Sequence, residues 1–156
     1  MLIGLGALVV VGGIIWNLMD SRDLPDRARR EYVEAELAKA EGVLMALPVD
    51  LPPGYGPANF WGSATGPDGT AVSRDVTFFP SEAGGADGRI VGVQMCVESA
   101  SDHQENCVID SDNNSVVRRV EDIRVVIDLS DHDPTNRAAW QSVPFTTDLN
   151  KVRWLH

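Results

Sequence analysis

Five consecutive polar residues, Asp110–Asn114, have the side-chain types that hold a calcium ion. Together with Glu121 they place oxygen atoms at positions 1, 3, 5 and 12 of a loop, as in an EF-hand. Asp110, Asp112, Asn114 and Glu121 are therefore candidate metal ligands.

Other features of this stretch depart from a calcium loop. Position 6, which needs glycine for the sharp turn, is Ser115, and position 9 is the cationic Arg118. The flanking residues have the composition of strands, not helices. A polar turn between Ile109 and Val116 explains the same residues, because Asp and Asn favour turns.

A second polar cluster, Asp128–Asp133, contains three aspartates and His132. Such groups can bind a metal or act as general acid and base, so a membrane-bound hydrolase or metal-dependent enzyme could use this loop. The alternative is that Asp133 caps a helix beginning at Pro134 and that the other side chains are solvated.

Cys96 and Cys107 are the only cysteines, eleven positions apart. In an exported domain they would form a disulfide, which contributes about 3 kcal/mol for so short a loop. In a cytosolic domain they would stay reduced. We expect the disulfide, and the reduced pair is the alternative.

No sequence motif points to a particular reaction or cofactor. P-loop, G-x-G-x-x-G, G-x-S-x-G, H-E-x-x-H and C-x-x-C patterns are all absent, so no cofactor is expected. Thirteen basic against 23 acidic residues give a net charge of −10. This balance excludes a nucleic-acid binder that works by broad phosphate neutralisation.

The elements that would position these residues begin with an uncharged run, Met1–Met19, of fourteen hydrophobic residues, four glycines and one Asn. As a helix, Leu2–Met19 would be roughly 27 Å long, enough to cross the hydrocarbon core. No basic residue precedes the run, and Asn17–Asp20 is a poor cleavage site, which favours an uncleaved anchor over a signal peptide. Residues 1–19 are therefore predicted to be a single-pass transmembrane anchor in the lipid bilayer.

Two signals disagree about the side of the membrane on which the rest of the chain lies. Four arginines, Arg22, Arg27, Arg29 and Arg30, follow the run closely and favour a cytoplasmic side. The cysteine pair favours an oxidising compartment. We expect an extracytoplasmic domain in the cell membrane; the alternative is a cytoplasmic-facing accessory subunit of a membrane protein complex.

Residues 20–47 are predicted to be a juxtamembrane helix, starting at about Leu24 after Asp23 and stopping at about Ala46, before Pro48. Five apolar residues recur at alternating spacings of four and three and would share one face. This stripe either forms a dimer seam or another protein contact, or packs on the following domain. The stripe residues are Val33, Leu37, Ala40, Leu44 and Leu47.

The remainder is predicted to be a Pro/Gly-rich connector, 48–58, and an acidic β-rich domain, 59–156. Residues 42–156 carry eight basic and sixteen acidic side chains, so this part holds most of the negative charge. Alternating apolar residues and turn signals predict about five strands in a mostly antiparallel sheet. The expected segments are Asn59–Ala64, Thr70–Phe79, Ile90–Glu98, Asn106–Asp110 and Ser115–Leu129, then a short helix, Pro134–Gln141, and a final strand, Asn150–Leu155. The spacing of Val116, Val120, Ile123 and Ile127 also fits a helix, but the β-branched content of Ser115–Leu129 favours a strand, at least in its second half.

The expected fold is therefore α+β: a transmembrane helix, an amphipathic helix and an antiparallel sheet. The sequence favours a membrane-anchored, extracytoplasmic binding or accessory module over an enzyme, because no catalytic signature is present. The ligand or partner stays unidentified at this stage.

Overall fold

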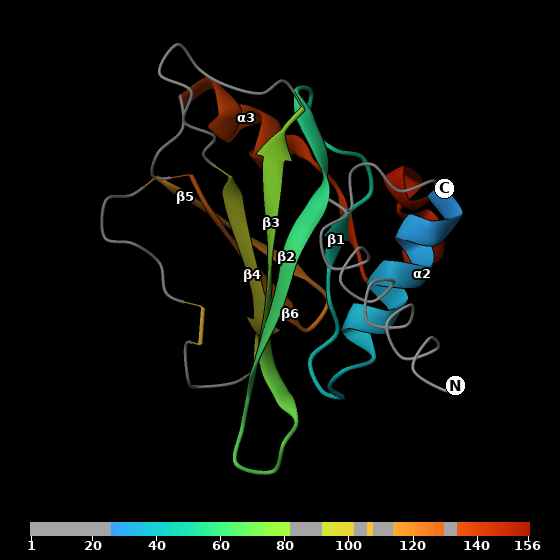
Figure 1. Cartoon of the computed structure of the whole chain (residues 1–156). Coiled ribbons are helices and arrows are strands. Elements are labelled where there is room, and N and C mark those ends of the chain that lie inside the picture. Colours follow the sequence, from blue (N-terminus) through green and yellow to red (C-terminus); the bar gives the residue numbers. More distant parts are fainter. Residues whose placement is uncertain (1–25, 82–91, 102–105, 108–113, 130–133) are drawn as a thin grey trace, which may run out of the picture.

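The computed structural model describes residues 26–81, 92–101, 106–107, 114–129 and 134–156. Within these residues the fold is α+β, with two α-helices and a five-stranded antiparallel sheet, as predicted (Figure 1). The sheet order is β2-β3-β4-β6-β5. Its strands are β2 (Tyr55–Thr65), β3 (Ala71–Pro80), β4 (Val93–Ser99), β5 (Ser115–Val120) and β6 (Ile123–Asp128).

The remaining elements lie mainly on one side of this sheet (Figure 1). Helix α2 packs against the short helix η3, and helix α3 against β5. A second sheet consists of two short antiparallel strands, β1 and β7. The bounds are α2 (Asp26–Leu37), β1 (Leu47–Pro48), α3 (Pro134–Ser142), β7 (Phe145–Thr146), η2 (Leu149–Lys151) and η3 (Arg153–Leu155).

The face of the sheet toward α2, here the inner face, carries the core. Alternate residues of β3, β4 and β6 point to it, as the period of two requires. Trp140 of α3 and Trp154 of η3 pack against Phe78 of β3, with ring centroids 5.3 and 6.1 Å away. The inner-face residues with no exposed surface are Val76, Phe78, Val93, Met95, Val97, Val125 and Ile127.

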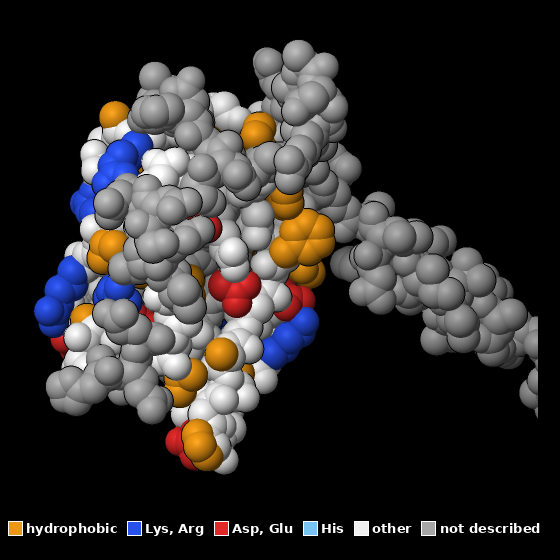
Figure 2. Space-filling view, turned by 90° about the vertical axis from the view of Figure 1, so that its left-hand side faces the viewer, with side chains coloured by type: hydrophobic (Ala, Val, Ile, Leu, Met, Phe, Trp, Pro, Cys, Tyr) orange, Lys and Arg blue, Asp and Glu red, His pale blue; other side chains and the backbone are white. Residues whose placement is uncertain are grey.

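The opposite side, here the outer face, is more polar. It carries Asp75 of β3, Gln94, Cys96 and Glu98 of β4, and Asp128 of β6. Figure 2 looks onto this side and shows acidic side chains near its centre and basic ones mainly along its left-hand edge.

The helix expected to reach Ala46 ends instead at Leu37. Glu41 and Val43 bond through their backbones to Ala71 at the start of β3, with N···O distances of 2.6 and 2.9 Å. Gly42 lies between them at φ 131°, a conformation that a helix cannot contain.

The five stripe residues consequently do not form one helical face. Val33, on α2, is buried in the domain's own core, and Leu37 packs against that core. Leu47 is fully buried in β1, whereas Leu44 is 62% exposed. Ala40 lies in the turn after α2 and is half-buried.

Three further predictions differ from the observed elements. Strand β2 begins at Tyr55, inside the predicted connector 48–58. The single segment Ser115–Leu129 is a hairpin of β5 and β6, with a two-residue turn between them. The expected final strand is replaced by η2 and η3, where Asp148 caps η2 by accepting a hydrogen bond from the Asn150 amide.

The predicted anchor, Met1–Met19, lies outside the described residues, as does the expected start of the helix at Leu24. Among the residues that the structure does describe, none of the helices has the length and apolar character needed to cross a bilayer.

Candidate functional site

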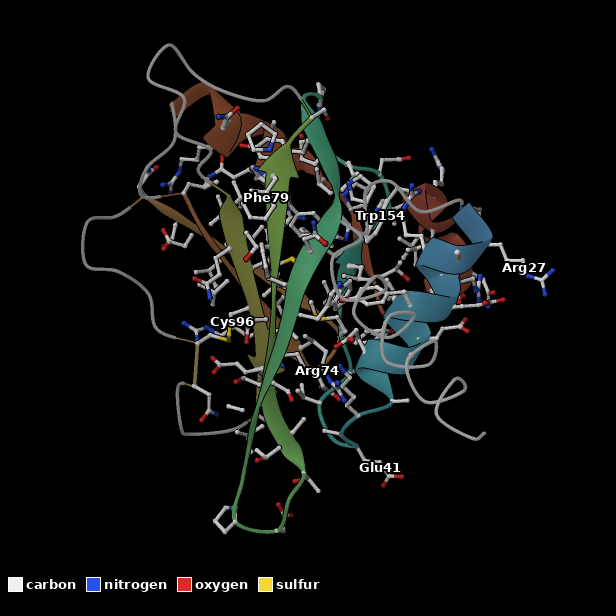
Figure 3. All side chains as sticks on the ribbon, in the orientation of Figure 1. Arg27, Glu41, Arg74, Phe79, Cys96 and Trp154 are labelled. Carbon is white, nitrogen blue, oxygen red and sulfur yellow. A yellow bond between two sulfur atoms is a disulfide. The ribbon has the colours of Figure 1, made fainter. Side chains whose placement is uncertain are left out.

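Cys96 and Cys107 form a disulfide, as predicted. Cys96 lies on β4 and faces outward, opposite Asp75 of β3 and Val126 of β6. Cys107 is 1% exposed and comes after residues 102–105, which are outside the described part. The bond therefore fastens Cys107 to the outer face at Cys96 (Figure 3).

Glu98 holds Asn106 and Cys107 without a covalent bond. Its carboxyl oxygen Oε2 accepts hydrogen bonds from the backbone N–H groups of Asn106 and Cys107, at 2.6 and 2.8 Å. Its other oxygen, Oε1, accepts from the guanidinium of Arg124 on β6. Glu98 is only 2% exposed, and these partners satisfy the buried charge.

A cavity of about 300 Å³ opens next to the disulfide on the outer face. We call it the outer-face pocket. Its walls carry two carboxylates, two amides and a hydroxyl, together with a few apolar atoms. The residues around it are Ala64, Ser73, Asp75, Gln94, Cys96, Asn106, Val126 and Asp128.

Asp75 is the outer-face pocket's most distinctive group. Burial raises the pKa of its carboxyl above the ordinary value of an aspartate. A Cβ atom added to Gly62 of β2 would lie 2.6 Å from the Asp75 carboxyl oxygen, so the missing side chain there leaves room for the acid. Asp75 makes no hydrogen bond or ion pair to another described residue, which leaves both oxygens available to a ligand.

Further along β3, on the same face, two aromatic rings are in contact. Phe60 of β2 is 71% exposed and meets Phe79 edge to face, with centroids 5.6 Å apart. Phe60 has φ 51°, a strained conformation for a bulky residue that occurs at a bulge between Asn59 and Gly62. Since Phe79 is four positions after Asp75 on the strand, apolar surface lies roughly 13 Å from the acid.

The structure separates two of the predicted calcium ligands. Asn114 directly precedes β5 and Glu121 directly follows it, so roughly 20 Å of strand lies between them. Because calcium ligands all lie within about 2.6 Å of the ion, these two cannot bind the same one. Asp110 and Asp112 lie outside the described residues, and within the described part no three His, Cys, Asp or Glu side chains gather around a possible metal position.

The structure gives Asn114 and Glu121 other surroundings. The Asn114 side chain donates to the Leu129 carbonyl, and the Leu129 amide donates back to the Asn114 carbonyl at 3.0 Å. Glu121 is an exposed turn residue at φ 54°. Asn114 thus extends the β5–β6 pairing by one step.

Of the segment Asp128–Asp133, the structure describes Asp128, the last residue of β6, and Leu129. Asp128 lines the outer-face pocket, whereas Asp131, His132 and Asp133 lie outside the described residues. The loop is followed by α3, which begins at Pro134. Two of the residues that the sequence singled out, Cys96 and Asp128, thus line the pocket. No signal in the sequence marks Asp75 and Gln94, which also line it, or Glu98, which holds Cys107.

Comparison of the chain with models of known protein families, with curated proteins and with solved structures found no match.

Proposed function

We propose that this chain is a membrane-tethered binding module whose domain lies outside the cytoplasm and uses the outer-face pocket to bind a ligand. The observation that carries the proposal is the Cys96–Cys107 disulfide. Such bonds persist in oxidising compartments and are rare among cytosolic proteins. Because Cys96 lines the pocket, the bond that indicates an oxidising compartment is also part of the proposed binding site.

The tether is supported by the uncharged run Met1–Met19, long enough as a helix to cross the hydrocarbon core. Two of the arginines that favour the opposite topology are used by the fold. Arg29 donates to the Trp154 carbonyl at 3.0 Å, and Arg30 to the Asn150 side chain at 2.9 Å. These residues therefore have a structural reason to be basic besides any effect on membrane orientation.

The lining of the pocket favours a ligand with a positively charged, hydrogen-bonding group. Asp75 and Asp128 supply negative charge, and Gln94 supplies an amide. A cation in the pocket would relieve the cost of keeping the partly desolvated Asp75 carboxylate charged. A ligand with an apolar part could also reach Phe60. A basic side chain of a partner protein has these properties.

The location can be tested with an epitope tag added after His156 of the full-length chain. We expect antibody to label intact cells, because the C-terminal residues pack on α2 within the same domain. A tag inside the cytoplasm at the N-terminus serves as the matched control and should label only after permeabilisation. Labelling of both tags only after permeabilisation would contradict the proposal.

Binding can be tested with N-acetyl-arginine amide as the probe, on the full-length chain in detergent. We expect its addition to shift the backbone NMR signals of Gln94, Cys96 and Val126, and Asp75→Asn to abolish those shifts. Asp122→Asn removes the same charge at the exposed β5–β6 turn and should leave them intact. Equal shifts in both variants would show non-specific attraction to an acidic surface and refute the site.

A further inference from the structure

The chain between Cys96 and Cys107 is fastened to β4 at two points on the same face. The first is the disulfide. The second is Glu98, two residues after Cys96, whose carboxylate binds the amides of Asn106 and Cys107 at 2.6 and 2.8 Å. Cys107 is thus held through its backbone amide as well as through its sulfur atom.

The Glu98 side chain is itself held in place by the neighbouring strand, β6. Glu98 and Arg124 are directly opposite each other on β4 and β6, and their side chains form an ion pair. Arg124 is 19% exposed in its side chain and Glu98 is 2% exposed, so water competes little with the pair. A carboxylate anchored in this way keeps its orientation toward the two amides.

Closing the disulfide requires the two sulfur atoms to meet. With oxidised glutathione, one cysteine thiolate attacks the glutathione disulfide and releases one glutathione thiolate. The second cysteine thiolate then attacks the resulting mixed disulfide and releases the other. Two protein thiols are oxidised and one glutathione disulfide is reduced to two thiols, and the second step is faster and more favourable when Cys107 is already held near Cys96.

We propose that Glu98, oriented by Arg124, is a positioning residue that holds Cys107 against β4 independently of the disulfide. The disulfide then forms between two cysteines that are already held close together. The Glu98 carboxylate also binds the backbone amide of Asn106, which lines the outer-face pocket, so the pocket keeps its shape when the disulfide is reduced. Only this last consequence rests on the proposed function.

The first test measures the thiol–disulfide equilibrium of the full-length chain in glutathione buffers. We expect Glu98→Gln to lower the effective concentration of the two thiols at least tenfold, which corresponds to about 1.4 kcal/mol. Glu121→Gln makes the same change at an exposed turn and should leave the equilibrium unchanged. An equilibrium for Glu98→Gln within twofold of the wild type would overturn the proposal.

The second test keeps Glu98 and removes the bond, so that it does not depend on the folding of the Glu98 variant. In a chain carrying Cys96→Ser and Cys107→Ser, we expect the amides of Asn106 and residue 107 to exchange with deuterium at least tenfold more slowly than an unstructured chain. Exchange at the unstructured rate, with β4 amides still protected, would overturn the proposal. Neither test uses a ligand or a membrane, so failure of the binding proposal would leave both results intact.

Discussion

The clearest energetic prediction concerns Arg74, a buried arginine on the inner face of β3. Its guanidinium donates hydrogen bonds to the backbone carbonyls of Val43 (2.7 Å), Leu37 (3.1 Å) and Ala40. In Figure 3 it points from the sheet toward the turn after α2. The residue is 7% exposed, so one side chain fastens the last carbonyls of α2 and the segment leading to β1.

Replacing Arg74 by Met keeps the aliphatic length and removes all three hydrogen bonds. Bonds to a charged group contribute about 1.5–3 kcal/mol each, so three independent bonds would exceed 4 kcal/mol. Part of this is offset, because burial lowers the pKa of the Arg74 guanidinium, which means that the cation is partly desolvated in the folded state. We therefore expect a net loss of about 2–4 kcal/mol in the free energy of unfolding.

The loss can be measured by urea denaturation of wild-type and Arg74→Met chains, followed by tryptophan fluorescence. Arg119→Met, which removes an exposed arginine from β5, is the control and should change stability by less than about 0.5 kcal/mol. We also expect faster proteolysis between Ala38 and Leu44 in Arg74→Met. A loss below about 0.5 kcal/mol, or unchanged proteolysis, would refute the role assigned to Arg74.

Three other substitutions test separate parts of the account by urea denaturation. Gly42→Ala should cost about 2–3 kcal/mol, because Gly42 has φ 131° and its new Cβ would lie 2.4 Å from the Ala71 carbonyl oxygen; an unchanged midpoint would contradict this close approach. Asp75→Asn should stabilise the protein at pH 7 but not below pH 3.8. Burial raises the Asp75 pKa, so the stability of the wild type falls as pH rises from 3.8 to the raised value. An equal effect of the substitution at both pH values would contradict the destabilising burial of the Asp75 carboxylate. Trp154→Phe should cost about 1–2 kcal/mol through the lost 2.9 Å hydrogen bond to the Pro48 carbonyl, and a neutral result would show that the bond is replaced by water.

The strands were predictable wherever one face is buried against the core. Val93, Met95 and Val97 alternate with more polar residues, and all three are fully buried on β4. The same alternation marks Ile123, Val125 and Ile127 on β6, although the sequence did not separate β6 from β5. The dividing turn lacks glycine and asparagine, and places Glu121 in a conformation that such residues usually adopt.

The end of α2 was not predictable from local sequence. Leu37, Ala40 and Leu44 continue a helical spacing, yet the chain leaves the helix after Leu37 because Arg74 and Ala71 bind its backbone. These bonds join residues that are 28 to 37 positions apart in the sequence, so no periodicity records them. Tertiary contacts here override a helical pattern that is weak because it contains Gly42.

The disulfide and the outer-face pocket also differ in whether the sequence predicts them. The disulfide could be predicted from the count and spacing of the cysteines. The outer-face pocket could not, because Asp75, Gln94 and Asp128 come from three strands and meet only through the register of the sheet. Glu98 resembles any charged strand residue in the sequence, and its role depends on Arg124, the residue opposite it.

The state and accessibility of the two cysteines in living cells test the central claim most directly. Intact cells producing the full-length chain are treated with a membrane-impermeant maleimide that adds mass, with and without prior reduction by a membrane-impermeant phosphine. An exported, disulfide-bonded domain predicts no labelling without reduction and labelling of Cys96 and Cys107 after it. Labelling that appears only after lysis, and without any reductant, would place reduced cysteines in the cytoplasm and contradict the account.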